Sequence, residues 1–121
     1  MSAQPMKLAE IAGHPGYFVL TLEPNTGPMV VLDHPFLQRL EATLKTVPST
    51  ALGVVIVSGS ERVFVAGADL KTIDAWDDQQ LDRYLAFGSE VFQMISDLPC
   101  PTAAAISGAA LGGGLELAMH C

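Results

Sequence analysis

The chain has 121 residues, a length that fits a single domain. Its net charge is -7 with only six lysine and arginine residues, which argues against a nucleic-acid partner or an anionic membrane surface. Half of the residues are hydrophobic and 16% are charged, against roughly 25% in typical globular domains. This much apolar surface predicts that a partner subunit, or a further part of the same fold, covers it.

The sequence carries no mark of export or of membrane insertion. Residues 1–13 lack the apolar core of a signal peptide, and Cys100 and Cys121 show no CxxC spacing. We therefore predict reduced thiols in a cytoplasmic protein. The apolar stretch 102–119 is interrupted by glycines and by Glu116, so it is interpreted as strand, turn and helix start and not as a membrane span.

The first third of the chain is predicted to be mostly extended. Residues from about 1 to 15 form a loose N-terminal arm. Aromatic and β-branched residues over 17–23 predict a strand. A proline- and glycine-containing turn at 24–28 leads to a short extended piece at 29–32.

An amphipathic helix is predicted over 35–47. Asp33 stands where a helix N-cap belongs, and Pro35 suits the first turn. Apolar residues recur at intervals of three and four, as a buried helix face requires. They are Leu37, Leu40, Leu44 and Val47.

Two further strands and a long helix follow. The wholly apolar run 53–59 predicts a strand buried on both faces, and 63–70 begins extended and turns at Gly67. The acidic run 74–82 is typical of a solvated helix start, and a helix is predicted over about 79–97. Its apolar stripe consists of Leu81, Tyr84, Leu85, Gly88, Val91, Phe92 and Ile95.

The C-terminal part repeats the pattern of strand, small-residue loop and helix. Residues 102–106 predict a third buried strand, and a helix begins after the glycines at 112–114. Strands and helices thus alternate, which predicts an α/β fold with crossover connections.

Two loops of this pattern are candidate anion sites. VAGADL (65–70) and GAALGGGLE (108–116) each follow a strand and open a helix with small residues. Small residues let a ligand approach the backbone, and helix-start N–H groups attract negative charge. Side by side, the loops would form a two-donor oxyanion hole. The alternative is that Gly and Ala only permit tight strand–helix packing, and spacing alone does not decide between the two.

Glu116 is the candidate proton shuttle. It lies three residues past Gly113, about one helical turn, and can face the same space as the loop N–H groups. We expect Leu115, Leu117 and Met119 to keep its surroundings dry, which favours proton transfer near neutral pH. The alternative is a structural glutamate that pairs with a basic residue or caps N–H groups.

Other chemistries find no support in the sequence. The glycines after residue 111 do not complete G-x-G-x-x-G, no phosphate-binding G-x-x-x-x-G-K-[ST] occurs, and no serine lies in G-x-S-x-G. His14, His34 and His120 lack the spacing of metal ligands, so no metal site is expected.

Residues ERVFVAGADLKTI (61–73) and PTAAAISGAALGGGLELAMHC (101–121) resemble the two signature blocks of the crotonase family, the enoyl-CoA hydratase/isomerase superfamily. The resemblance implies a crotonase-like β-β-α spiral that assembles as a homotrimer or hexamer. It implies no permanently bound cofactor, because coenzyme A enters as part of an acyl-CoA or enoyl-CoA substrate.

The resemblance also implies roles for individual residues. The backbone N–H groups of Ala68 and Gly113 would bind the thioester oxygen, and Glu116 would be one of the two glutamates with which hydratases add water. The backbone around Ala66 and Ala68 would meet the adenine, and Lys71 is the best candidate for the phosphates of the coenzyme. The implied substrate-binding residues are Val31, Ala66, Gly67, Asp69, Leu70, Lys71, Leu111 and Gly112.

The sequence departs from the family in two respects. The family often has Asn-Ala-Leu before the first helix, where this chain reads Val30-Val31-Leu32, so a pantetheine contact here would use the backbone. Family members are also longer. We therefore expect residues 1–121 to be the N-terminal part of a single crotonase-like domain, with the second glutamate beyond Cys121, and to be inactive alone.

The favoured interpretation is an enoyl-CoA hydratase. Within the family, the alternatives are a Δ3,Δ2-enoyl-CoA isomerase or the hydratase part of a fused fatty-acid oxidation enzyme. An alternative of another class is a non-catalytic fragment that only binds or assembles. A peptidase of related spiral fold is disfavoured, because no serine follows the glycine loop.

Overall fold

A computed structural model describes residues 3–25 and 27–121. None of the helices in these two ranges is both long and apolar enough to cross a membrane. In chain order the elements are β1 (Leu8–Glu10), β2 (Tyr17–Leu22), α1 (His34–Leu44), β3 (Gly53–Ser58), β4 (Val63–Val65), α2 (Leu70–Asp74), α3 (Asp78–Ser96), β5 (Thr102–Ala104), β6 (Ala109–Ala110) and α4 (Gly113–Met119).

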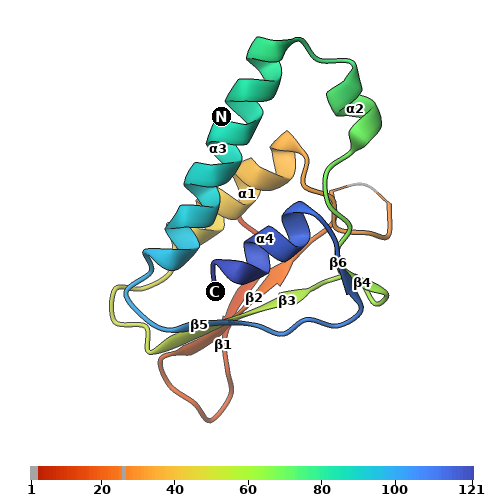
Figure 1. Ribbon diagram of the computed structural model, residues 1–121. Helices are drawn as coiled ribbons and strands as arrows, with labels where there is room; N and C mark the ends of the chain where they lie inside the picture. The colour runs from red at the N-terminus through yellow and green to blue at the C-terminus, as the bar shows by residue number, and fades with distance from the viewer. Residues whose placement is uncertain (1–2, 26) are drawn as a thin grey trace.

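A four-stranded sheet of order β1-β2-β3-β5 forms the base of the molecule (Figure 1). β1 pairs with β2 antiparallel, whereas β2, β3 and β5 run parallel. β4 and β6 form a separate parallel pair. Figure 1 shows α1, α3 and α4 on one side of the large sheet, and the core lies between these layers. Its fully buried side chains include Leu20, Ile56, Phe36, Val91 and Leu117.

The helices follow the local sequence signals closely. The helices predicted over 35–47 and 79–97 are α1 and α3. Asp33 caps α1 as predicted, because its carboxylate accepts the N–H of Phe36 at 2.8 Å. Within the acidic run, Asp77 caps α3 in a reciprocal capping box with Gln80. Each cap satisfies N–H groups that the first helical turn leaves unpaired.

Short elements with distant partners differ from the sequence predictions. The supposedly loose arm contains β1, and Met6 within it is buried, with its N–H bonded to Thr43 Oγ1 at 2.8 Å. The helix α2 and the strand β6 were not predicted. The strand expected over 102–106 is β5, which ends at Ala104.

The prediction that the central strands are buried on both faces was wrong. In β3, Val54 and Ile56 are buried while Val55 and Val57 are only partly covered. Ala103 in β5 is exposed. The reason is that the helices cover one face of the sheet, so burial alternates with the period of two that a strand imposes.

Residues 29–32, predicted as extended, form no regular strand but are held by hydrogen bonds on two sides. The N–H of Ala66 donates to Val30 O at 2.8 Å, and the N–H of Leu32 donates to Gly67 O at 2.9 Å. From the other side, the hydroxyl of Tyr84 on α3 donates to Leu32 O. The segment therefore ties α3 to the loop that follows β4.

Tyr84 offers a test of this attachment. Replacing Tyr84 with Phe removes the donor to Leu32 O, and we expect the free energy of unfolding to fall by about 1 kcal/mol. Burial, with a smaller contribution from Asp33, raises the pKa of Tyr84 above 10.0. The unfolded chain then loses this proton first, so the stability of the parent chain should decline as pH rises past 10.0.

Urea unfolding from pH 8 to 11, followed by circular dichroism, would measure both effects. The Tyr84→Phe chain should show the smaller loss of stability over the alkaline range. An equal loss of unfolding free energy in the two chains at alkaline pH would contradict the hydrogen bond from Tyr84 to Leu32 O.

Gly88 lies in the interior of the 19-residue helix α3 and has no backbone need for glycine. Its φ angle is not positive, and a Cβ built there would meet only Leu37 Cδ1, at 3.7 Å. Alanine is favoured over glycine in a helix by about 1 kcal/mol. We therefore expect Gly88→Ala to raise the free energy of unfolding by about 1 kcal/mol in a denaturant titration. A loss of stability would show that the helices pack more tightly around Gly88 than the structure indicates.

Candidate functional site

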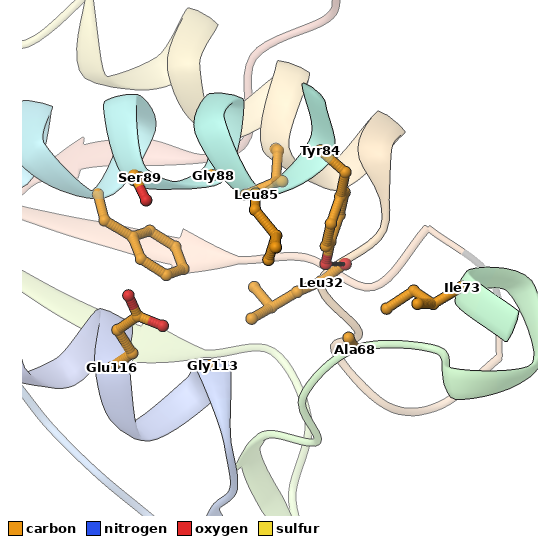
Figure 2. Close-up of a pocket in the computed structure, with 11 residues that line it drawn as sticks. Leu32, Ala68, Ile73, Tyr84, Leu85, Gly88, Ser89, Gly113 and Glu116 are labelled. Carbon is orange, nitrogen blue, oxygen red and sulfur yellow. Dashed lines mark hydrogen bonds between the residues drawn. The ribbon is translucent and has the colours of Figure 1, made fainter. Parts of the chain in front are cut away.

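The residues predicted to carry the chemistry meet at one pocket. Ala68, Gly113 and Glu116 together line a cavity of about 190 Å³ between α3, α4 and the loop after β4. Figure 2 shows Ala68 and Gly113 on the side of the pocket opposite the α3 residues. The two small-residue loops therefore lie together in space, the arrangement that a two-donor oxyanion hole would require.

Ala68 is placed by a sharp turn of the backbone. Gly67 has φ of +98°, a conformation that L side chains rarely adopt, and its carbonyl receives the N–H of Leu32. A Cβ at Gly67 would lie 3.2 Å from Leu111 O in the second loop, so glycine also permits the two loops to approach. Within residues 3–25 and 27–121, no acceptor receives the N–H of Ala68.

The three glycines of the second loop have separate roles. Gly112 takes φ of +51° at the N-cap of α4. A Cβ at Gly114 would lie 2.6 Å from Val65 O, so this glycine lets α4 pack against β4. Gly113, between them, is the first helical residue, and in the described part of the chain its N–H has no acceptor. Close contacts therefore favour glycine at both positions, since a Cβ at Gly113 would lie 2.5 Å from Leu32 Cδ1. Gly113 in addition brings a free N–H group to the pocket lining.

Glu116 lies at the rim of the pocket, and Figure 2 shows its carboxylate directed toward the helix that carries Ser89. The expectation of dry surroundings was wrong: Glu116 is exposed, as are Leu115 (50%) and Met119 (75%), and only Leu117 is buried. The reason is that no described element covers the outer face of α4. The alternative of a structural Glu116 paired with a basic residue also lacks support. The ion pairs among the described residues are Arg39–Glu23 and Lys45–Glu41, and neither involves Glu116.

The remaining lining of the pocket was not predicted from the sequence. Leu32, Leu37 and Ile73 contribute to it, but most of it comes from α3. The sequence signal that could have indicated this lining was the apolar stripe of α3, in which a polar hydroxyl (Tyr84) and a glycine (Gly88) interrupt larger apolar side chains. The structure divides this stripe between core and pocket. Its pocket-lining members are Tyr84, Leu85, Gly88 and Phe92, joined by Ser89.

Several residues of the predicted substrate-binding set support the pocket without lining it. Val31, Ala66 and Gly67 belong to the hydrogen-bonded segments beneath Ala68, and Leu111 and Gly112 form the turn before Gly113. Leu111 also donates its N–H to Val65 O at 3.2 Å. These residues set the backbone path that carries the two free N–H groups.

The remaining predicted residues lie on or before α2. Asp69 caps this helix, and its hydrogen bond from the Thr72 hydroxyl at 2.9 Å contributes most to lowering the pKa of the Asp69 carboxyl. Leu70 and Lys71 are exposed and line a separate shallow surface pocket. The structure thus does not bring Lys71 to the pocket that contains Ala68.

Comparison with known proteins places the chain in a family. The model of the enoyl-CoA hydratase/isomerase family matches residues 25–121. The fatty acid oxidation complex subunit alpha of Shewanella amazonensis is 38% identical over 109 residues, which are 88% of this chain and 15% of that protein. A probable enoyl-CoA hydratase of Rhizobium meliloti is 41% identical over 86 residues, 70% of this chain and 33% of that protein.

The fold has close counterparts among solved structures. The enoyl-CoA hydratase of Bacillus anthracis superposes with a TM-score of 0.83 at 28% identity, over 98% of this chain and 45% of that chain. An enoyl-CoA hydratase/carnithine racemase of Magnetospirillum magneticum gives the same TM-score at 25% identity. The chain thus spans less than half of these structures and has the crotonase fold over that part. With the family model matching most of its length and two free backbone N–H groups in one pocket, the chain belongs to the enoyl-CoA hydratase/isomerase family.

Proposed function

We propose that the pocket binds an acyl-CoA or enoyl-CoA thioester, with its carbonyl oxygen at the N–H groups of Ala68 and Gly113. The observation that carries the proposal is that both N–H groups lack an acceptor among the described residues and belong to residues lining one pocket. Each donor of an oxyanion hole stabilises developing negative charge by roughly 3 kcal/mol. The pocket needs no bound cofactor for this, because coenzyme A arrives with the substrate.

The reaction that we propose is hydration of a 2-enoyl-CoA. The oxygen of water bonds to C3, and the electrons of the C2–C3 double bond move toward the thioester oxygen, where the two N–H groups stabilise the enolate. The water gives up a proton to Glu116, a proton bonds to C2 in its place, and the enolate electrons restore the carbonyl. Glu116, on the rim beside Gly113, is the side chain assigned to proton transfer with water.

A second candidate is the hydratase part of a fused fatty-acid oxidation enzyme. It is favoured by the similarity to alpha subunits of the fatty acid oxidation complex, of which this chain would correspond to a small portion. A Δ3,Δ2-enoyl-CoA isomerase would use the same oxyanion hole with a different set of acids. Assembly as a homotrimer or hexamer would supply cover for Leu115 and Met119, which are exposed on α4.

Gly113 allows the proposed N–H donor to be tested without an activity assay. Proline is tolerated at the first position of a helix, so Gly113→Pro removes the N–H while α4 can still form. Any side chain here also presses on Leu32, because a Cβ would lie 2.5 Å from Leu32 Cδ1. Gly113→Ala therefore serves as the matched control, since it adds the carbon and keeps the N–H.

The measurement is the infrared carbonyl band of but-2-enoyl-CoA labelled with ¹³C at the thioester carbon. Two N–H donors polarise the carbonyl, so the band should move to lower frequency in the parent chain and in Gly113→Ala. In Gly113→Pro we expect much of this displacement to be lost. Equal displacement in all three chains would rule out the N–H of Gly113 as a donor.

Glu116 is tested through the chemical step. With the chain in excess over but-2-enoyl-CoA, even slow hydration is measurable as loss of the enoyl absorbance. Glu116→Gln keeps the shape but removes the proton acceptor, so hydration should slow by about 10²-fold or more while thioester affinity is kept. Glu90→Gln makes the same change at an exposed position of α3 outside the pocket, and as the control it should leave the hydration rate unchanged.

Two results would speak against these assignments. An unchanged hydration rate in Glu116→Gln would exclude the residue from proton transfer. Absence of thioester binding to the parent chain would contradict the assignment of this pocket to a CoA thioester.

A further inference from the structure

We propose that Gly88 determines how long an acyl chain the pocket accepts, by leaving open the part of the pocket wall where α3 faces Leu37. The proposal rests on the proposed function, because it assigns the acyl group of the thioester to this part of the pocket. Both Gly88 and Leu37 line the pocket that contains Ala68 and Gly113.

The polar and apolar groups of the pocket are unevenly distributed. The two free N–H groups belong to Ala68 and Gly113, and Glu116 lies beside them on α4. The facing wall is formed by α3 and by Leu37, and Figure 2 shows Leu85 projecting from α3 into the space between these walls. A thioester whose oxygen lies at the N–H groups would therefore extend its alkyl chain along an apolar wall, as burial of methylene groups favours.

Neither the backbone nor the packing accounts for glycine at this position. The φ angle of Gly88 is one that any residue adopts, and an added Cβ would make an ordinary 3.7 Å contact with Leu37 Cδ1. In a helix interior glycine is less favourable than alanine. A helix crossing that required close approach would bring neighbouring atoms much nearer, as Val65 O is to Gly114. What glycine provides here is room in the pocket lining that a side chain in contact with Leu37 would fill.

Binding of two CoA thioesters to the 121-residue chain tests this assignment. Isothermal titration calorimetry would give the Kd of butanoyl-CoA and of decanoyl-CoA for the parent, Gly88→Ala and Gly88→Leu. Gly88→Leu should weaken decanoyl-CoA by about tenfold, the loss expected when about two methylene groups leave an apolar site. Butanoyl-CoA should change by less than about twofold.

Two further chains keep the result interpretable. Ala86→Leu adds the same side chain at an exposed position of α3 outside the pocket, and we expect it to change neither Kd. Gly88→Ala is expected to fold at least as well as the parent and to weaken decanoyl-CoA in the same direction by a smaller factor. It provides the measurement if the leucine chain does not fold.

The outcomes separate the two proposals. Selective loss of decanoyl-CoA in the Gly88 variants supports the assignment. If the parent and both Gly88 variants bind both thioesters alike, Gly88 does not set the length and the proposed function stands. If the parent binds neither thioester, the proposed function fails and this inference fails with it.

Discussion

The pocket depends on how a single residue, Leu32, is held. Its N–H donates to Gly67 O, its carbonyl accepts the hydroxyl of Tyr84, and its Cδ1 would lie 2.5 Å from a Cβ added at Gly113. Three walls of the pocket, from distant parts of the sequence, are therefore positioned against one short segment. Because this segment is hydrogen-bonded on both sides, it holds the neighbouring N–H groups in fixed positions. Preorganised donors of this kind make an oxyanion hole effective.

The glycines around this segment do not all meet the same structural requirement. Gly67 and Gly112 adopt positive φ angles, and Gly114 lets α4 contact β4. Neither a positive φ angle nor a close contact requires glycine at position 88, and for that reason we propose that Gly88 serves ligand binding.

The sequence predicted best those features whose causes are local. Asp33 and Asp77 cap their helices with atoms three residues away, and the stripe of α3 has a regular period, so both helices were predicted to within a few residues. β1 and β6 were missed because they are two or three residues long and exist only through distant partner strands. The convergence of Ala68, Gly113 and Glu116 was predicted from loop layout and family resemblance together. The exposure of Glu116 was not predicted, because cover is set by what packs outside α4.

The parallel pairing of the sheet has a consequence for how the chain folds. Tyr17 pairs with Gly53, and Val54 pairs with Thr102, so each parallel contact closes a long segment of chain before any pairing is gained. Sheets built from such distant contacts assemble slowly compared with helical bundles. The helices α1 and α3 carry strong local signals, whereas the strands must wait for their partners. Because the pocket draws on segments near residues 32, 68, 88 and 113, it is completed only when this slow assembly is finished, and no single part of the chain contains a working fraction of it.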